Sequence, residues 1–163
     1  MTPTPPESGP RLAVVTGAAG FVGRHLVAGL ADRGWTVRAV DLPGMVPPAH
    51  GDRVEWIEGD IRQGARFDAV LEGADTVFHL ASAHLQVGAS VEWYRSVNVD
   101  AMGPLVRACA AAGVRRLVHT SSVGIYGHVP APPADEDSPK NPGNLYEKTK
   151  LEGEELAMRE AEG

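Results

Sequence analysis

The stretch Thr16–Gly23, which reads TGAAGFVG, decides the fold of this 163-residue chain. It joins the apolar run Leu12–Thr16 to a segment whose apolar residues recur at helical spacing, so a buried strand should turn directly into a helix. Gly17 permits a tight turn, Gly20 lets the backbone approach a ligand closely, and Gly23 lets the helix pack against the strand. Because free N–H groups at a helix start attract phosphate, the stretch predicts a pyrophosphate-binding loop.

The same alternation of strand and helix continues along the chain. Apolar runs predict strands at 12–16, 36–41, 76–80 and 116–120, and alternating apolar and polar residues predict one at 54–58. Helical spacing predicts helices at 21–33, 65–71, 91–112 and 145–160. Parallel strands joined by helices form a doubly wound α/β sheet, here Rossmann-like with about five strands. Ligands of such sheets bind at the carboxyl ends of the strands, where the strand order reverses. Pro104 falls inside the helix predicted at 91–112 and should kink it.

The composition is that of an ordinary globular protein. Hydrophobic residues make up 43% and charged residues 22%, and no apolar run reaches the roughly 18 residues of a membrane span. The net charge of −6 argues against binding to nucleic acid or to an anionic membrane. A single cysteine, Cys109, fits a cytoplasmic protein without disulfides, and we expect it to be a small buried side chain. Residues 1–10 are expected to be a disordered extension and residues 11–163 one domain.

Two carboxylates at strand ends extend the predicted dinucleotide site. Asp41 ends the second strand, 18 residues after Gly23, and can accept both ribose hydroxyls of an adenosine. It would repel a 2′-phosphate, and Leu42 stands where an arginine could have held one, so the sequence favours NAD over NADP. Asp60 follows the third strand and could accept from the adenine amino group. The alternatives are a solvated strand-end carboxylate at 41 and an ordinary turn aspartate at 60.

A second group of residues suggests proton transfer. Tyr146 and Lys150 lie four residues apart on the last predicted helix and so share one face. A neighbouring ammonium favours the phenolate form of a tyrosine, which can then exchange a proton with a hydroxyl. Ser121 and Ser122 follow the fifth strand, where a hydroxyl can donate to a substrate oxygen. A surface tyrosine beside a solvated lysine is the alternative, and His84 is either part of this site or an ordinary loop residue.

Five segments in this order resemble the extended short-chain dehydrogenase/reductase family, the NAD-dependent epimerase/dehydratase group. They are Thr16–Gly23, His79–Ser82, Asn98–Asp100, Thr120–Gly127 and Tyr146–Lys150. The resemblance covers nearly all of residues 11–160 and implies an NAD-binding fold. It also implies hydride transfer at a hydroxyl or keto group, with a sugar nucleotide as the expected substrate.

The resemblance assigns roles to single residues. It makes Ser122, rather than Ser121, the catalytic hydroxyl, and Tyr146 the residue that carries the proton. It lets Lys150 also bind the nicotinamide ribose, and it puts Asn98 beside a proton-relay water. No metal site is expected. The cofactor-binding residues expected from these arguments together are Gly17, Ala19, Gly20, Phe21, Val22, Gly23, Asp41, Asp60, Ile61, Leu80, Ala81, Ser82, Tyr146 and Lys150.

The family continues past its lysine helix with further strands and a small substrate domain, and nothing in this sequence corresponds to them. We therefore expect an incomplete NAD-binding domain whose fifth strand keeps a free edge. The resemblance also implies a homodimer through helices 91–112 and 145–160. A non-catalytic dinucleotide-binding or scaffolding domain, inactive because the C-terminal substrate part is absent, is the alternative function. The intact set Ser122, Tyr146 and Lys150 argues against it, because a non-catalytic protein could have lost any of the three.

Overall fold

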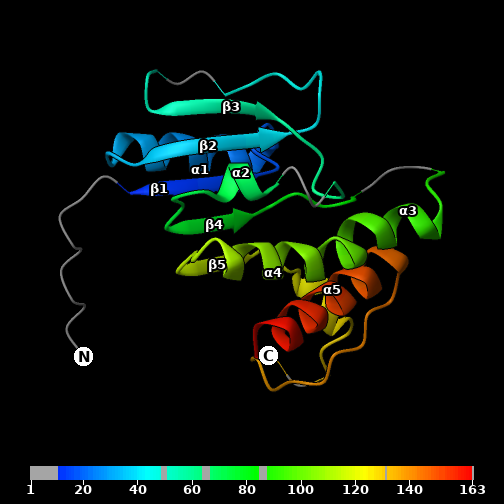
Figure 1. Ribbon diagram of the computed structural model, residues 1–163. Helices are drawn as coiled ribbons and strands as arrows, with labels where there is room; N and C mark the ends of the chain where they lie inside the picture. The colour runs from blue at the N-terminus through cyan, green and yellow to red at the C-terminus, as the bar shows by residue number, and fades with distance from the viewer. Residues whose placement is uncertain (1–10, 49–50, 64–66, 85–87, 131, 163) are drawn as a thin grey trace, which may run out of the picture.

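The computed structural model describes residues 11–48, 51–63, 67–84, 88–130 and 132–162, so the extension expected at 1–10 lies outside it. Five parallel strands form one sheet in the order β3-β2-β1-β4-β5 (Figure 1). The strands are β1 (Leu12–Thr16), β2 (Thr36–Asp41), β3 (Val54–Glu58), β4 (Thr76–His79) and β5 (Arg116–His119). The predicted sheet is confirmed, with β4 and β5 each ending one residue earlier than expected. The strand order reverses between β1 and β4, which opens a crevice at that edge.

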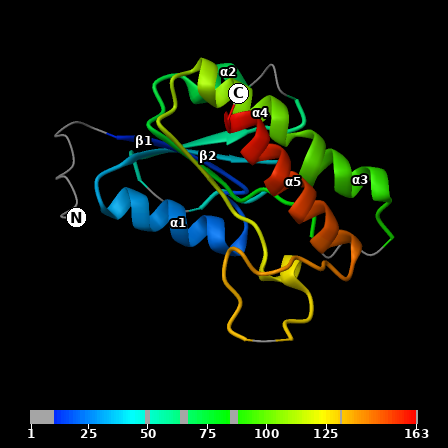
Figure 2. The same ribbon diagram turned by 90° about the horizontal axis from the view of Figure 1, so that it is seen from below.

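Helices cover both faces of the sheet. They are α1 (Phe21–Asp32), α2 (Phe67–Leu71), α3 (Val91–Arg95), α4 (Met102–Ala111) and α5 (Leu145–Glu162). Figure 2 shows α1 on one side of the sheet and α2, α3, α4 and α5 on the other. A 3-10 turn, η3 (Val123–Tyr126), which the sequence did not predict, follows β5. The start of the helix predicted at 65 lies outside the described residues.

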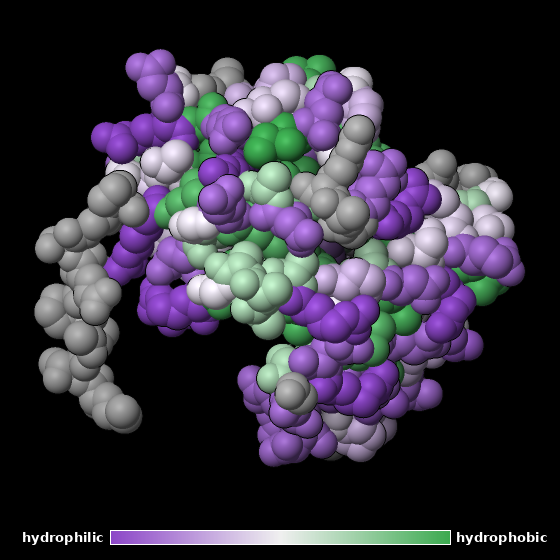
Figure 3. All heavy atoms as spheres, in the orientation of Figure 1, coloured by the Kyte–Doolittle hydropathy of each residue, from purple (hydrophilic) through white to green (hydrophobic). Residues whose placement is uncertain are grey.

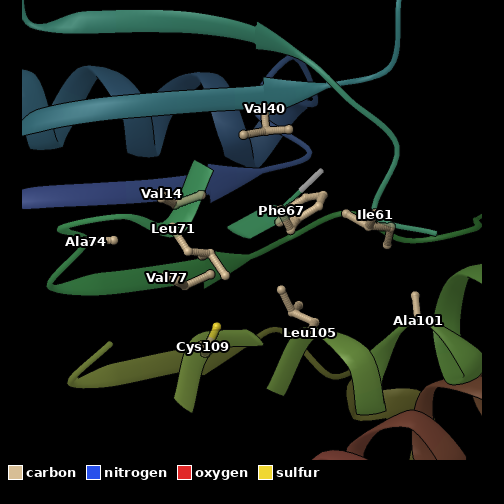
Figure 4. Packing of buried hydrophobic residues seen from close by; sticks show 10 residues of the cluster. All are labelled: Val14, Val40, Ile61, Phe67, Leu71, Ala74, Val77, Ala101, Leu105 and Cys109. Carbon is tan, nitrogen blue, oxygen red and sulfur yellow. The ribbon is translucent and has the colours of Figure 1, made fainter. Parts of the chain in front are cut away.

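Two hydrophobic clusters hold the layers together, one on each face. Alternate residues of β1 point to opposite faces, as its pleat requires. Val14 joins the cluster under α2 and α4, where Leu71, Leu105 and Cys109 meet the strands (Figure 4). Burial raises the pKa of the Cys109 thiol to about 11, so this side chain behaves as a small apolar group, as predicted. The cluster under α1 contains Ala13, Val15, Val27, Leu30, Val37 and Ala39.

The helix predicted at 91–112 is interrupted by a π-helical turn, η2 (Ser96–Asp100), which lies between α3 and α4. Pro104 has no N–H to donate to the carbonyl of Asp100, so regular α-helical bonding cannot run through this point. The expected irregularity is therefore present, and it takes the form of a widened turn. The turn directs the carbonyl of Asn98 at α5, where an ideal Cβ on Gly153 would lie 2.0 Å from that oxygen. Only glycine permits this approach.

The surface follows from this layering. In Figure 3, weakly apolar side chains gather near the centre of one face with polar ones around them, and a shallow hollow there is lined by α2 and α4. Among the described residues, β5 is an edge strand, as expected, and Val118 on it is 37% exposed. In the part of the chain that the structure describes, no helix has the length and apolarity to cross a membrane.

Candidate active site

A cleft of about 260 Å³ opens where the strand order reverses, at the carboxyl ends of the strands. Eight of the residues predicted to bind the cofactor line it, namely Gly17, Gly20, Asp41, Asp60, Ile61, Leu80, Ala81 and Ser82. Trp93 and Met45 line it too, and the sequence did not single them out. Tyr146 and Lys150 lie on α5, outside this lining. The structure thus gathers residues that are far apart in the chain into one elongated site.

In the glycine loop, neighbouring backbone atoms occupy the space that the side chain of any other residue would need. Gly17 has φ +70°, and an ideal Cβ on it would lie 2.7 Å from the backbone nitrogen of Ala81. A Cβ on Gly23 would lie 2.2 Å from the carbonyl oxygen of Gly17, so the helix can approach the loop only with glycine there. No side chain caps the start of α1, and its first backbone bond runs from Arg24 N to Gly20 O. The amides of residues 21–23, which open the helix and have no acceptor within it, can therefore serve an anionic ligand.

Asp41 anchors the glycine loop as well as facing the cleft. Its Oδ2 accepts from the backbone nitrogen of Ala19 at 2.8 Å, and its Oδ1 accepts from that of Leu42 at 2.8 Å. A carboxylate has about four acceptor sites, so two remain for ribose hydroxyls. Arg24 supports the same loop, because its Nε donates to the carbonyl of Ala19 at 2.6 Å and its guanidinium also reaches the carbonyl of Val46. The sequence did not reveal this arginine, since its partners lie five and 22 residues away.

Asp60 is paired with an arginine that the sequence analysis overlooked. Arg62 Nε lies 3.0 and 2.9 Å from the two carboxylate oxygens of Asp60, and the guanidinium makes a further ion pair. Hydrogen bonding from Arg62 lowers the pKa of Asp60, so the carboxylate is anionic. Both side chains line the cleft. An adenine amino group would therefore share this carboxylate with Arg62.

The predicted catalytic residues come from two elements that face each other. Ser122 caps η3, and its Oγ accepts from the backbone nitrogen of Gly124 at 3.1 Å. Tyr146 lies in the first turn of α5 and Lys150 one turn later, with the lysine only 3% exposed. Desolvation lowers the pKa of Lys150 to about 8, although Glu154 opposes the shift. His84 packs its ring against that of Tyr146, with centroids 4.5 Å apart, so it belongs to this site and not to a remote loop.

A row of polar side chains crosses the ends of three neighbouring strands. Thr16, His79 and His119 stand in register on β1, β4 and β5. Thr16 Oγ1 lies 2.8 Å from His79 Nδ1, and the two imidazoles stack with centroids 5.4 Å apart. Burial, followed by the nearby charge of Lys150, lowers the pKa of His119 to about 4. Burial lowers the pKa of His79 to about 3, with His119 and Lys150 adding to the effect, so both rings are neutral at pH 7.

Some polar atoms near this row have no partner among the described residues. Both ring nitrogens of His119 and the hydroxyl of Ser121 are buried without a hydrogen bond there. The sequence analysis gave no role to the side chain of His79 or of His119. Among the described residues, no three His, Cys, Asp or Glu side chains gather as a metal site would require. The register of the strand ends was the signal that could have brought His79 and His119 together.

Asn98 fastens the segment after β4 to α5. Its Oδ1 accepts from the backbone nitrogen of Ala83 at 2.8 Å and from Ser82 Oγ at 3.1 Å. Its Nδ2 donates to the carbonyl of Ala83 at 3.2 Å and to Thr149 Oγ1 at 3.0 Å. These four bonds use the whole hydrogen-bonding capacity of the amide. The side chain therefore holds the segment after β4 against α5, and its place beside a relay water stays a prediction.

Residues 13–162 match the sequence model of the NAD dependent epimerase/dehydratase family. The chain belongs to this family. The family resemblance drawn from five short segments is thus confirmed over nearly the whole chain, and so is the expectation that the family depends on NAD.

Relatives within the family carry different names. A 3 beta-hydroxysteroid dehydrogenase/Delta 5-->4-isomerase of Mycobacterium tuberculosis is 39% identical over 154 residues, covering 89% of this chain and 41% of the relative. A UDP-glucose 4-epimerase of Mycolicibacterium smegmatis is 39% identical over 157 residues, covering 86% of this chain and 48% of the relative. The chain therefore spans less than half the length of either relative. A short-chain dehydrogenase/reductase superfamily protein from Agrobacterium tumefaciens, solved with NAD, superposes with a TM-score of 0.80 at 36% identity, over 90% of this chain and 44% of that one.

Proposed function

We propose that this chain supplies the NAD-binding and catalytic residues of an enzyme that interconverts a hydroxyl and a keto group by hydride transfer. The observation that carries the proposal is that Tyr146 and Lys150 lie four residues apart on one face of α5 and that Lys150 is only 3% exposed. A solvated surface lysine would contribute little to a tyrosine, whereas a desolvated cation acts strongly on its neighbours. The alternative of a surface tyrosine beside a solvated lysine is disfavoured by this burial.

The cleft suits NAD in shape and in chemistry. The glycine loop leaves backbone amides at the start of α1 for the pyrophosphate, and Asp41 keeps acceptor sites for the adenosine ribose. A carboxylate at that place repels a 2′-phosphate, which favours NAD over NADP. The residues after β4, Leu80–Ser82, form the wall that leads toward the predicted catalytic residues. NAD, when bound, supplies the acceptor for the hydride that leaves the carbinol carbon.

The chain's own groups would handle the proton. Ser122 Oγ already accepts from Gly124 N–H, so its hydroxyl proton is free to donate to the substrate oxygen. Tyr146, as phenolate, takes the proton of the substrate hydroxyl as its C–O bond becomes a carbonyl. Lys150 stabilises the phenolate by its charge. In the reverse direction, Tyr146 returns the proton to the reduced oxygen.

For the substrate we propose a sugar nucleotide, in keeping with the name of the UDP-glucose 4-epimerase relative. The name of the hydroxysteroid dehydrogenase relative supports a second candidate, a hydroxysteroid. Both classes carry a secondary hydroxyl, which is what the proposed proton transfer requires. Discrimination between them needs direct measurement with each.

Two measurements test the proposal. Calorimetry should detect NAD binding, and incubation with NAD and either UDP-glucose or a 3β-hydroxysteroid should yield keto product or an epimer. Tyr146→Phe is the matched control, since it removes only the phenolic hydroxyl. NAD binding with no conversion of either substrate would favour the non-catalytic dinucleotide-binding alternative, and absence of NAD binding would refute both functions.

A further inference from the structure

Glu147 ties the start of α5 to the segment before it. Its Oε2 accepts from the backbone nitrogen of Gly143 at 2.7 Å and from that of Asn144 at 3.3 Å. In return, Glu147 N donates to Asn144 Oδ1 at 3.0 Å. This reciprocal pair is a capping box, with the glutamate at the third helical position and its charge near the positive end of the helix dipole. Tyr146 lies inside this capped turn, immediately before Glu147.

The same glutamate side chain also presses on the turn that carries Ser122. An ideal Cβ on Gly124 would lie 2.7 Å from Glu147 Cγ and 2.8 Å from Glu147 Oε1. Gly124 is therefore in close contact with the glutamate, and no residue with a side chain fits unless Glu147 moves. The backbone nitrogen of Gly124 is the group that donates to Ser122 Oγ. A helix cap alone has no need of this contact.

A second tie holds η3 to the segment that leads into α5. The backbone nitrogen of Asn141 donates to the carbonyl of Ile125 at 2.9 Å. Gly127 ends η3 with φ +59°, and an ideal Cβ on it would lie 2.1 Å from Asn141 O. The turn with Ser122 is thus attached at its middle by Ile125 and at its end by Gly127. The Gly124–Glu147 contact then sets how closely it approaches α5.

We propose that Glu147 is a positioning residue, whose contact with Gly124 fixes the separation between the hydroxyl of Ser122 and the phenol of Tyr146. The two functional groups come from η3 and α5, and the only covalent link between them is the long segment 127–144. The Asn141 tie shortens this link at the Ile125–Gly127 end of the turn, and the contact of Glu147 with Gly124 holds the end that carries Ser122. Glu147 belongs to α5 and contacts Gly124 of η3, so it fixes the distance between these two elements. The proposal rests on the proposed function for the roles of Ser122 and Tyr146.

Amide hydrogen exchange tests the positioning without requiring turnover. In Glu147→Ala, exchange at Gly143 and Asn144 should accelerate because their acceptor is gone. The proposal further expects exchange at Gly124 to accelerate at least about tenfold, since its turn is no longer held. Gly124→Ala should produce the reciprocal effect at Gly143 and Asn144. If either variant leaves the amides of the opposite element unchanged, Glu147 is a helix cap only and the proposal is overturned.

Matched controls separate positioning from general loss of structure. Glu147→Gln keeps the length and an oxygen acceptor, so it should restore exchange at Gly124 to near the native rate. Glu155→Ala removes an exposed glutamate of the same helix, and Gly51→Ala adds a Cβ with no atom within 4 Å. Neither control should change exchange at Gly124 or Gly143. If Glu147→Ala fails to fold, the Gly124→Ala and Glu147→Gln variants still decide the question.

Kinetics give an independent readout where conversion is measurable. Glu147→Ala should lower kcat about ten- to hundredfold while the Kd for NAD changes less than about twofold, because a misplacement near 1 Å has that effect on rate. In a Ser122→Ala background, Glu147→Ala should cost less than about twofold more, since the hydroxyl that it positions is absent. Full additivity of the two changes would overturn the proposal. A native protein without turnover would refute the proposed function alone and leave the exchange test standing.

Discussion

Replacing His119 by phenylalanine should stabilise the protein, and more strongly in acid. Both ring nitrogens of His119 are buried without a partner among the described residues. Leaving buried polar atoms unpaired costs about 1–3 kcal/mol, which a phenylalanine of similar shape avoids. The stacking against His79 is retained, because a phenyl ring can take the same place. At pH 7 we therefore expect the free energy of unfolding to rise by about 1–3 kcal/mol.

The acid effect follows from the pKa of His119, which burial and then Lys150 lower from 6.5 to about 4. Between these two values the unfolded chain binds a proton that the folded chain does not, so native stability falls as the pH falls through this window. Above pH 6.5 neither state is protonated and the term vanishes. At pH 5, which lies about 1.5 units below the unfolded-state pKa, this proton binding lowers the free energy of unfolding of the native chain by about 2 kcal/mol. His119→Phe removes this loss, so its advantage over the native chain should grow by about 2 kcal/mol between pH 7 and pH 5.

Urea unfolding followed by circular dichroism at pH 7 and pH 5 measures both quantities. Groups that His119 does not influence titrate equally in the two proteins, so their contributions cancel in the difference. His128→Phe is the control, because His128 is exposed and its replacement should give no gain that depends on pH. An advantage of His119→Phe that is equal at the two pH values would show that the buried ring is not held neutral. Destabilisation at pH 7 would show that its nitrogens are satisfied.

Four further outcomes are expected. Asp41→Ala should weaken NAD at least roughly tenfold and relax discrimination against NADP in calorimetry, because the ribose acceptor and the anchor of the glycine loop are both lost; equal affinity of the native chain for NAD and NADP would contradict this. Tyr146→Phe should abolish conversion with NAD affinity within a few fold, and Ser122→Ala should slow it about 10²-fold; unchanged turnover in Tyr146→Phe would refute the assignment. Gly153→Ala should lower stability by about 1–3 kcal/mol or more in thermal unfolding, since its Cβ would lie 2.0 Å from Asn98 O. Sedimentation should detect self-association through the face formed by residues 91–112 and by α5, and a monomer at high micromolar concentration would count against it.

Local patterns determined the succession of elements and the place of the cofactor cleft. The predicted strands lie within one residue of those observed. The central strand β1 is buried along most of its length and so is apolar almost throughout, whereas β3 is partly exposed and shows alternation. The spacing of Gly17, Gly20 and Gly23 identified a strand-to-helix turn, since each glycine answers a local steric need. The position of Asp41 in the cleft could be predicted because it ends the second strand, 18 residues after Gly23. Pro104 predicted an irregular helix, but not that the irregularity would be a π turn.

Tertiary structure alone decided which side chains meet. The pairing of β4 with β5 stacks His79 on His119, 40 residues apart, and no periodicity in the chain encodes such a contact. The packing of α5 against α4 and η2 buries Lys150, and this burial lowers the pKa of a lysine that the sequence places on an ordinary helix. It also brings Glu147 against Gly124. Burial and close approach depend on long-range packing, so the sequence determined which chemical groups are present and the fold determined their protonation and spacing.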